Sequence, residues 1–187
     1  LHGGFEVSLV ELADEDGEYE DWIEIYNSGA TAVNLDGYGL TDDPDEPFKW
    51  VFPAEIIQPG EFLIVWASDK ERATPGSPLH TNFKISAGGE DIVLTAPGGV
   101  QEDFLPEADL ETDISYGRQP DGPGALLFFT EPTPGASNTT TGYSAILEPP
   151  ALSHGGGFYA AGFQLELTTD QPNTTIYYTL DGSEPTT

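Results

Sequence analysis

The sequence predicts an all-β fold, built as a sandwich of two sheets. Short runs rich in β-branched and aromatic residues recur along the 187 residues, and most of them end at Gly, Pro, Asn or Asp. No stretch shows a convincing 3.6-residue apolar period of the kind that marks an amphipathic helix. These two observations together favour short strands joined by tight turns, which is the pattern of a β-sandwich.

The strongest strand signal is the segment 22–26, in which apolar and acidic residues alternate. Because successive side chains of a strand point to opposite faces, Ile23 and Ile25 share one face and Trp22, Glu24 and Tyr26 share the other. The dipeptide Pro59-Gly60 predicts a tight reversal, since Pro presets φ and Gly can take a positive φ. The other strands predicted in this part of the chain are 5–12, 32–35, 38–41, 49–52, 62–67, 91–95, 100–104, 114–117 and 125–129.

A change of composition predicts two domains, 1–138 and 139–187. The segment 131–142 is rich in Pro, Thr, Gly, Ala, Ser and Asn, which breaks the strand pattern and is typical of a linker. Strand patterns then return at 145–148, 163–169 and 174–179. A complete sandwich of this type needs about seven strands, so the second domain is expected to be truncated and to leave an open sheet edge that either pairs with another chain or stays frayed.

The charge of the chain is strongly negative. There are 33 Asp and Glu residues against 5 Lys and Arg, which gives a formal net charge of −28. Nucleic acids and anionic lipid surfaces are bound by clustered Lys and Arg, so neither is an expected partner. The acidity is explained either by solubility of a salt-adapted secreted protein or by calcium binding.

Several features describe the setting of the protein. The chain has no Cys, which excludes disulfides and thiolate metal sites. No apolar run approaches the roughly 20 residues needed to span a bilayer, so membrane insertion is not expected. The chain starts with Leu1 and not with Met, which predicts a piece of a longer protein.

Ordered motifs in residues 5 to 138 resemble the bacterial branch of the lamin tail domain family. The resemblance implies an immunoglobulin-like β-sandwich for this part. Asn27 and Asn34 are expected to tie turns through bonds from side chain to backbone. The motifs that carry the resemblance are 22–27 (WIEIYN), 33–37 (VNLDG), 50–53 (WVFP), 57–65 (IQPGEFLIV), 81–85 (TNFKI), 115–122 (SYGRQPDG) and 132–138 (PTPGASN).

The second part resembles the start of the C-terminal immunoglobulin-like module of chitobiases and related β-hexosaminidases. The matching residues are Phe158-Tyr159, the run 165–169 and the run 176–186 (IYYTLDGSEPT). In those enzymes the module is an accessory without a catalytic carboxylate. The resemblance therefore implies that the chain is a fragment of a longer secreted or surface-attached bacterial protein. In such proteins both modules sometimes occur beside hydrolase or kinase-like domains.

The sequence offers no arrangement typical of an enzyme. The histidines are His2, His80 and His154, which lie near the terminus, in a loop rich in Pro and Thr, and beside a triple glycine. Nothing in the pattern places them beside a serine and a carboxylate, as nucleophilic catalysis requires. We therefore predict that the chain is not an enzyme and binds no cofactor, apart from Ca²⁺.

Calcium is the best chemical hypothesis for the acidic residues. Ca²⁺ takes six to eight oxygen ligands, and loops dense in Asp can supply them. Two segments qualify, one with Asp14 and Asp16 and the other with Asp42, Asp43 and Asp45. The first segment, 14–18, lacks the bidentate Glu at loop position 12 and is no EF-hand, whereas the second, 42–46, has four acids around one Pro. The alternative for each is a solvated hairpin tip.

Aromatic residues suggest a second ligand class. Trp22, Trp50 and Trp66, with Tyr19, Tyr26 and Tyr38 nearby, could form a stacking surface for sugar rings. The alternative is that these residues belong to the core. Arg118 is expected to pair with local carboxylates or carbonyls and so to pin a crossing segment.

The triplets 138–140 and 173–175, both Asn-Thr-Thr, fit the N-glycosylation pattern, although in a bacterial protein the match would be a coincidence. Together these observations predict a non-catalytic structural or interaction module that is extracellular or at the cell surface. Its expected partners are neighbouring domains of the parent protein and a surface protein or glycan. The alternatives are a carbohydrate- or calcium-dependent binding module and, as an outsider, an accessory part of a hydrolase.

Overall fold

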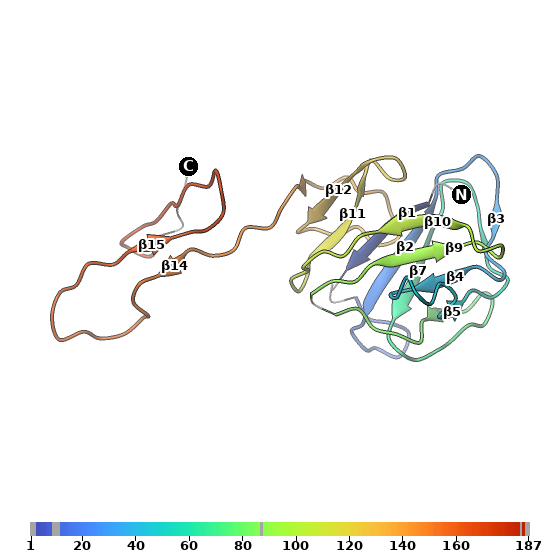
Figure 1. Ribbon diagram of the computed structural model, residues 1–187, viewed down its shortest axis with the longest axis horizontal. Helices are drawn as coiled ribbons and strands as arrows, with labels where there is room; N and C mark the ends of the chain where they lie inside the picture. The colour runs from blue at the N-terminus through green and yellow to red at the C-terminus, as the bar shows by residue number, and fades with distance from the viewer. Residues whose placement is uncertain (1–2, 9–11, 87, 184, 186–187) are drawn as a thin grey trace. The chain divides into compact units, whose positions relative to one another are not determined.

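The computed structural model describes residues 3–8, 12–86, 88–183 and 185. Within these residues every regular element is a strand and none is a helix, which confirms the predicted all-β fold class. The chain forms two compact units, Leu1–Ser144 and Ala145–Thr187 (Figure 1).

The first unit contains the longer strands. In chain order they are β1 (Gly3–Ser8), β2 (Asp21–Asn27), β3 (Val33–Asn34), β4 (Gly39–Thr41), β5 (Trp50–Val51), β6 (Ile56–Ile57), β7 (Phe62–Ala67), β8 (Leu79–His80), β9 (Ile92–Thr95), β10 (Gln101–Leu105), β11 (Ser115–Gln119), β12 (Ala125–Phe129) and β13 (Gly142–Tyr143). The predicted first strand, 5–12, is present as β1, and residues 9–11 lie outside the described part of the chain.

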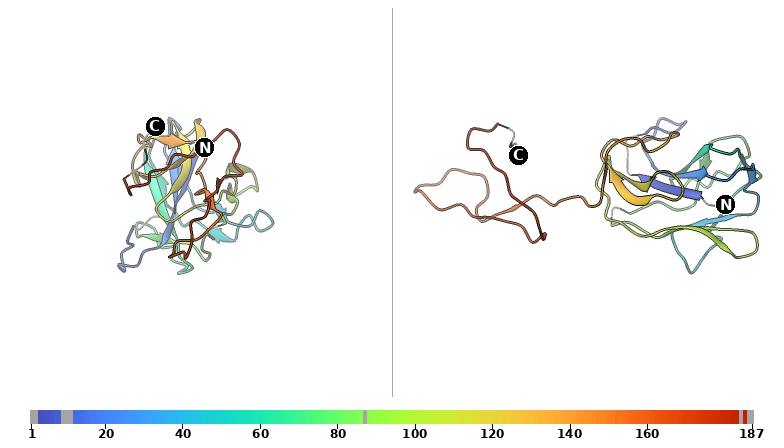
Figure 2. Two further views of the ribbon diagram at one scale, coloured as in Figure 1. Left: turned by 90° about the vertical axis from the view of Figure 1, so that its left-hand side faces the viewer. Right: turned by 90° about the horizontal axis from the view of Figure 1, so that it is seen from above.

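Two sheets form the body of the first unit. The larger has the order β13-β12-β11-β1-β2-β7-β8 and the smaller the order β10-β9-β4-β5. The views in Figures 1 and 2 show them as the two layers of a sandwich. All pairs are antiparallel except β7 with β8, and the short pair β3-β6 forms a separate ribbon.

The interior of the sandwich is filled by one face of each sheet. Ile23 and Ile25 of β2 and Val65 of β7 are fully buried, as are Leu40 of β4 and Leu94 of β9. Burying side chains of this size stabilises the fold by about 1.5–3 kcal/mol each. The turn chemistry agrees with the sequence, because Gly60 of the Pro59-Gly60 turn has φ 75°.

The opposite face of β2 is also buried. Trp22 is fully buried and Glu24 is 2% exposed, although a sheet face turned toward solvent would leave both side chains accessible. Glu24 accepts a hydrogen bond of 2.5 Å from the backbone N–H of Gly135, so the chain around Gly135 crosses this face. We call residues 131–141 the covering segment.

The covering segment corrects the prediction that residues 131–142 form a linker. Gln119 Nε2 donates to the carbonyl oxygens of Asn138 at 2.7 Å and Thr140 at 2.9 Å. Asn138 is 8% exposed, and its side-chain amide donates to the carbonyl of Arg118 at 3.2 Å. The segment leads directly into β13, which pairs with β12. Its composition suited a linker, but its polar groups bind the backbone of the larger sheet.

Arg118 links the two sheets. From β11 its guanidinium donates to Asp103 Oδ1 and to the carbonyl of Phe104, both in β10 and both at 3.0 Å. The side chains of Arg118 and Asp103 are 16% and 10% exposed. A planar, multi-donor cation suits this place because it satisfies a carboxylate and a carbonyl together, as the sequence predicted.

The second unit contains one short sheet. It is formed by β14 (Ala151–Leu152) and β15 (Leu167–Thr168), which pair antiparallel. Strands predicted at 145–148 and 174–179 do not form, and of the predicted strand 163–169 only β15 is present. Large apolar side chains remain exposed here, including Phe158 at 109% and Leu180 at 94%.

Candidate functional site

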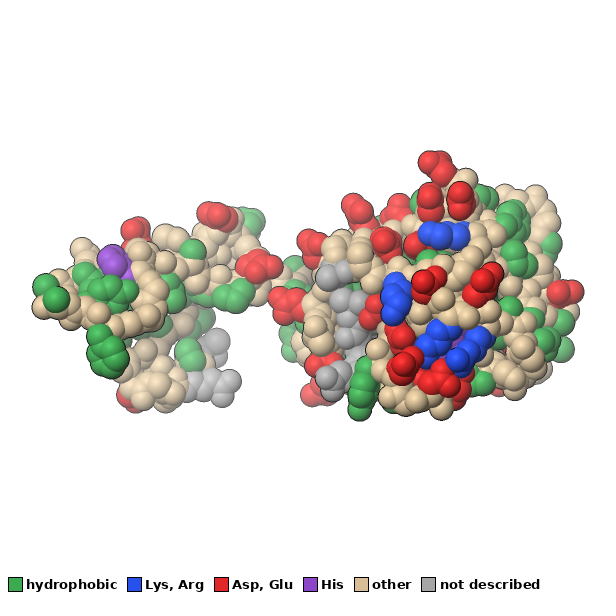
Figure 3. Space-filling view, turned by 90° about the horizontal axis from the view of Figure 1, so that it is seen from below, with side chains coloured by type: hydrophobic (Ala, Val, Ile, Leu, Met, Phe, Trp, Pro, Cys, Tyr) green, Lys and Arg blue, Asp and Glu red, His purple; other side chains and the backbone are tan. Residues whose placement is uncertain are grey.

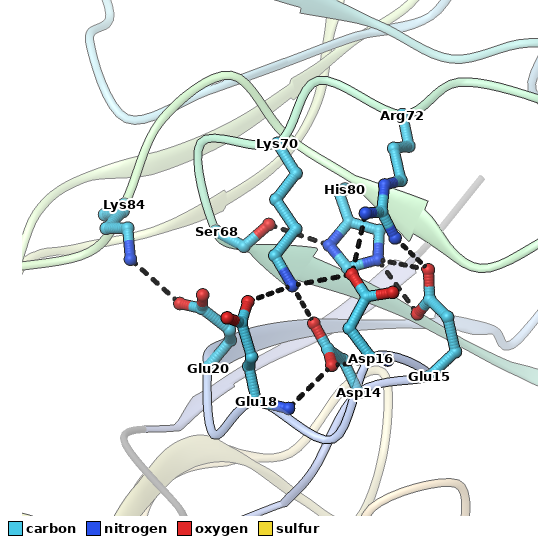
Figure 4. Close-up of polar contacts among 10 residues, drawn as sticks. All are labelled: Asp14, Glu15, Asp16, Glu18, Glu20, Ser68, Lys70, Arg72, His80 and Lys84. Carbon is cyan, nitrogen blue, oxygen red and sulfur yellow. Dashed lines mark hydrogen bonds and ion pairs between the residues drawn. The ribbon is translucent and has the colours of Figure 1, made fainter.

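The first unit brings many ionisable side chains together at one place, which we call the charged cluster. An acidic hairpin over residues 13–19 supplies its carboxylates, and a loop over residues 68–72, after β7, supplies its cations (Figure 4). The cluster consists of Asp14, Glu15, Asp16, Glu18, Lys70, Arg72 and His80.

The hairpin is shaped by its first acidic residue. Asp14 Oδ1 accepts hydrogen bonds from the backbone N–H groups of Asp16 at 2.9 Å and Glu18 at 3.0 Å. Such bonds from an Asp side chain to the backbone two residues on are typical of tight turns. Gly17 completes the turn with φ 79°. The local sequence therefore turns the carboxylates of the hairpin toward one side.

The loop that carries the cations has an unusual backbone. Asp69 has φ 63° and Glu71 has φ 51°, so both neighbours of Lys70 lie in the left-handed region. That conformation costs of order 1 kcal/mol or more for such residues and persists where surrounding contacts hold it. The isolated bridges Ser68 to Lys84 and Arg72 to His80 hold both ends of the loop.

Lys70 lies among three carboxylates. Its ammonium contacts Asp14 Oδ2, Asp16 Oδ2 at 3.1 Å and Glu18 Oε2 at 2.7 Å. The side chain of Asp14 is 0% exposed and that of Lys70 is 17% exposed. An ammonium has three donors, so one lysine can satisfy all three acids.

Arg72 binds the same hairpin from a second direction. Its Nη1 lies 2.5 Å from Glu15 Oε1, and its Nη2 lies 2.7 Å from Asp16 Oδ2. Beside the cluster, Lys84 pairs with Glu20 at 2.9 Å. Three of the 5 basic residues of the chain thus hold this hairpin and its flank. In Figure 3 the Lys and Arg side chains on this face border acidic ones.

These contacts favour the charged forms of the groups. Burial raises the pKa of Asp14, but the hydrogen bonds from Lys70 and from the backbone outweigh it and lower that pKa to about 2. The hydrogen bond from Arg72, followed by that from Lys70, lowers the pKa of Asp16. The hydrogen bonds to Asp14 and Glu18 raise the pKa of Lys70. At neutral pH these contacts hold Asp14, Asp16 and Lys70 in their charged forms.

His80 joins the cluster to the sheet. Its Nδ1 lies 2.7 Å from Ser68 Oγ, and its Nε2 lies 3.0 Å from Glu15 Oε2. Because a carboxylate only accepts hydrogen bonds, Nε2 carries a proton and donates to Glu15. The ring of Trp66 stacks beside the imidazole, with the ring centroids 6.3 Å apart.

The grouping of Ser68, His80 and Glu15 has the residue types of a catalytic triad. No local motif predicts this grouping, since Glu15 lies 65 positions from His80 in the chain. His80 is 0% exposed and Ser68 is 4% exposed, so a substrate cannot reach the hydroxyl. Glu15 is also held by Arg72. The arrangement fits a buried hydrogen-bond chain better than a nucleophile, which must be open to a substrate.

The structure brings Asp14 and Asp16 of the predicted calcium residues together. With Glu18 they offer oxygen atoms that lie within 4.8 Å of one another, and Asp14, Glu15 and His80 form an overlapping set. The ammonium of Lys70 lies among the first three carboxylates. A calcium ion bound there would therefore have to displace Lys70.

The other predicted calcium residues, Asp42, Asp43 and Asp45, make separate interactions and share no common hydrogen-bond or ion-pair partner among the described residues. Asp42 pairs with Lys49 at 2.7 Å, and Asp43 Oδ1 accepts the backbone N–H of Asp45 at 3.0 Å. Within the described ranges these three carboxylates do not form a convergent group of ligand atoms. A lysine partner and a turn bond explain two of them without an ion.

The tryptophans of the predicted sugar-binding surface are core residues. Trp22, Trp50 and Trp66 are 0%, 3% and 8% exposed. Trp50 packs edge-on against Phe52, with ring centroids 4.7 Å apart. These rings cannot present an open platform to a sugar, so the alternative interpretation of them as core is the correct one.

Hollows differ between the two units. One near Tyr116 and Leu105 in the first unit holds about 10 Å³, which is close to the minimum for a single water molecule. In the second unit a hollow of about 340 Å³ is lined by Leu147, Pro150, Thr169 and Tyr177, among others. Neither contains residues of the charged cluster.

Sequence reasoning placed Glu15 and Glu18 in the candidate acidic loop 14–18 but missed Ser68, Lys70, Arg72 and His80 as members of the same site. The acidic hairpin was identified, but its partners lie more than fifty positions away. One signal could have found Lys70 and Arg72, because they are two of only 5 basic residues in the chain and a single residue separates them.

Comparison with family models gives two matches. Residues 6–105 match the Lamin Tail Domain, and residues 154–187 match the Chitobiase/beta-hexosaminidase C-terminal domain. Both resemblances predicted from the motifs are confirmed, and the first match ends before β11, whereas the motifs suggested an end near residue 138. No curated protein and no solved structure matches the chain significantly. Among the described residues no helix is present that could cross a membrane.

Proposed function

Since the chain belongs to the lamin tail domain family through residues 6–105, we propose that it is a non-catalytic structural and interaction module of a larger protein. The model that matches residues 154–187 also describes a family of immunoglobulin-like domains. Such families are typically non-catalytic. The proposed role is to position neighbouring domains of the parent protein and to contact a surface protein or glycan.

One observation carries this proposal: the ionisable groups that converge in the first unit bind one another. Lys70 and Arg72 hold four carboxylates of the hairpin, and His80 is buried between Ser68 and Glu15. Catalytic groups need access to a substrate and a pKa suited to proton transfer. Here the pKa of Asp14 is about 2, which keeps it ionised and unable to donate a proton at neutral pH. The cluster therefore supports a structural role.

An extracellular or surface location is the second part of the proposal. The net charge of −28 and the absence of Cys suit a protein that stays soluble where salt screens its charges and that needs no disulfides. Treating intact source cells with proteinase K tests this point. We expect loss of the antibody signal for this chain while a cytoplasmic marker remains, and protection of the chain in intact cells would contradict the location.

The non-catalytic role has a separate test. A fluorophosphonate probe, which labels activated serines, is added to the purified full chain and to the Ser68→Ala variant. We expect no labelling of either protein above a heat-denatured control. Labelling of the unmodified chain that disappears in Ser68→Ala would overturn the proposal and make the Ser68, His80 and Glu15 group a reactive site.

Calcium binding is the second candidate function, favoured by the convergence of Asp14, Asp16 and Glu18. A bound ion would stabilise the folded state, so the unfolding temperature should rise with Ca²⁺ and fall again with chelator. NaCl at matched ionic strength controls for charge screening. If Lys70→Gln binds Ca²⁺ by calorimetry and the unmodified chain does not, the lysine occupies the place of the cation. If neither protein binds Ca²⁺, the calcium candidate fails.

A further inference from the structure

The two Asn-Thr-Thr triplets of the chain have opposite structural settings. Both fit the Asn-X-Thr pattern of N-glycosylation acceptors. A glycan is bulky and hydrated, so its acceptor asparagine must lie at an accessible surface of the folded protein. The first triplet begins at Asn138, which is buried in the first unit. The second begins at Asn173, which is exposed in the second unit.

Asn138 is closed to modification in the folded chain. It is 8% exposed, and its side-chain nitrogen donates to the carbonyl of Arg118 at 3.2 Å. Its side-chain oxygen accepts a hydrogen bond from Thr133 Oγ1 at 3.1 Å. A sugar attached to this nitrogen would break these bonds and displace the covering segment from the larger sheet. The motif here serves the fold.

Asn173 lies in an exposed turn of the second unit. It has φ 61°, in the left-handed region that asparagine tolerates well, and both Asn173 and Thr175 are exposed. Thr174 holds the turn by donating from its hydroxyl to the carbonyl of Gln171 at 2.8 Å. The amide to be modified and the Thr hydroxyl required by the motif are thus accessible together.

We propose that Asn173 is an acceptor site for an N-linked glycan and that Asn138 is not one in the folded protein. In the reaction the Asn173 Nδ2 atom forms a bond to C1 of an oligosaccharide carried on a polyprenyl pyrophosphate. The bond between C1 and the phosphate oxygen breaks, the polyprenyl pyrophosphate leaves, and the amide nitrogen loses one proton. In the cell the site is used where the chain is exported, as proposed above, and where the source organism has an oligosaccharyltransferase; in a bacterium without that enzyme the triplet is a coincidence.

The test uses the purified full chain and does not depend on where the protein resides. Folded chain is incubated with a single-subunit oligosaccharyltransferase that requires only Asn-X-Thr, together with its lipid-linked oligosaccharide. A parallel reaction contains a tryptic digest of the chain, in which the fold is lost. Intact mass and peptide mapping locate the glycan.

We expect modification at Asn173 alone in the folded chain and at both asparagines in the digest. Asn173→Gln and Thr175→Ala should each abolish modification of the folded chain, and far-UV circular dichroism should show that both variants keep the fold. Modification of Asn138 in the folded chain would overturn the proposal. So would an unmodified Asn173 in a folded chain whose digest is modified, and so would a digest that is not modified at Asn173.

Discussion

The two units show the same sequence pattern with different outcomes. In β2 of the first unit, alternation places Ile23 and Ile25 in the core of a sandwich, where both are fully buried. In the second unit, 165–169 alternates in the same way, but only Leu167–Thr168 is paired, and Leu165 is 48% exposed. A strand pattern states which residues share a face, and it becomes burial only where a second layer covers that face.

The sharpest test of this difference compares one substitution in both units. Phe129 is 0% exposed in β12, whereas Phe158 is 109% exposed. Phe129→Ala should lower the free energy of unfolding by about 3–5 kcal/mol, because a buried ring leaves a cavity. The urea midpoint followed by tryptophan fluorescence measures it, since all 3 tryptophans lie in the first unit.

Phe158→Ala should change stability by less than about 0.5 kcal/mol, because its ring has little burial to lose. Hydrogen exchange of residues 145–187, read by mass spectrometry, is the measurement for this unit. Faster exchange throughout the unit after Phe158→Ala would show that this ring belongs to a core in solution. The contrast between the units would then be wrong.

Lys70→Met is expected to have the next largest effect. It leaves Asp14, whose side chain is 0% exposed, without its ammonium partner beside Asp16 and Glu18. Removing one partner of a buried ion pair is strongly destabilising, so Lys70→Met should lower the free energy of unfolding by clearly more than the loss of an exposed ion pair does. Urea unfolding at neutral pH measures it.

Lys84→Met is the control for that variant. Lys84 pairs with Glu20, but its side chain is 57% exposed, and exposed pairs contribute about 0–1 kcal/mol. Equal losses for the two lysine variants would mean that total charge and not the geometry of the cluster sets stability. High salt should also reduce the effect of Lys84→Met more than that of Lys70→Met.

A pair of asparagine variants tests the covering segment. Asn138→Ala removes side-chain bonds to Arg118 and Thr133 and leaves buried groups unsatisfied, which should cost about 1–3 kcal/mol. Asn173→Ala lies in an exposed turn and should leave the first unit unchanged. If Asn138→Ala leaves tryptophan-detected unfolding unaltered, the segment is a linker after all.

The smallest effect concerns acid. The pKa of Asp14 is lowered from its ordinary value of 3.8 to about 2 by bonds that outweigh burial, so its ionised form stabilises the folded state. That stability is complete above 3.8 and is lost as the pH falls through about 2. Asp14→Asn should therefore be less stable than the unmodified chain at neutral pH, and the gap should narrow in acid. A gap that stays constant down to pH 2 would contradict this assignment.

The sequence predicted the longer strands of the first unit because period two and turn residues are local signals. It missed β6 and β8, which are two residues long, and β13, whose surroundings have the composition of a linker. It also predicted the strand 174–179, which lacks a partner to pair with in the described second unit. Local patterns carry no information on whether a partner strand is present.

The charged cluster could be predicted only in part for the same reason. Asp14 and Asp16 were selected as a dense acidic loop, but Lys70 and Arg72 reach them from a loop that follows β7. Pairing across that distance is fixed by the antiparallel register of β2 with β7, in which Asp21 lies opposite Ala67. With a net charge of −28, neighbouring acidic residues are common along the chain, so the acidic hairpin could not be distinguished from the others by composition.

The position of β13 has a mechanical consequence. β13 lies at one end of the larger sheet and, among the strands that the structure describes, pairs with β12 alone, through two residue pairs, whereas β1 lies between β11 and β2. Tension applied to the chain beyond Ser144 would reach the β12–β13 pair before it reaches the central strands of the sheet. The first unit would thus open first at this end, and the chain released there would extend while the central strands stay paired.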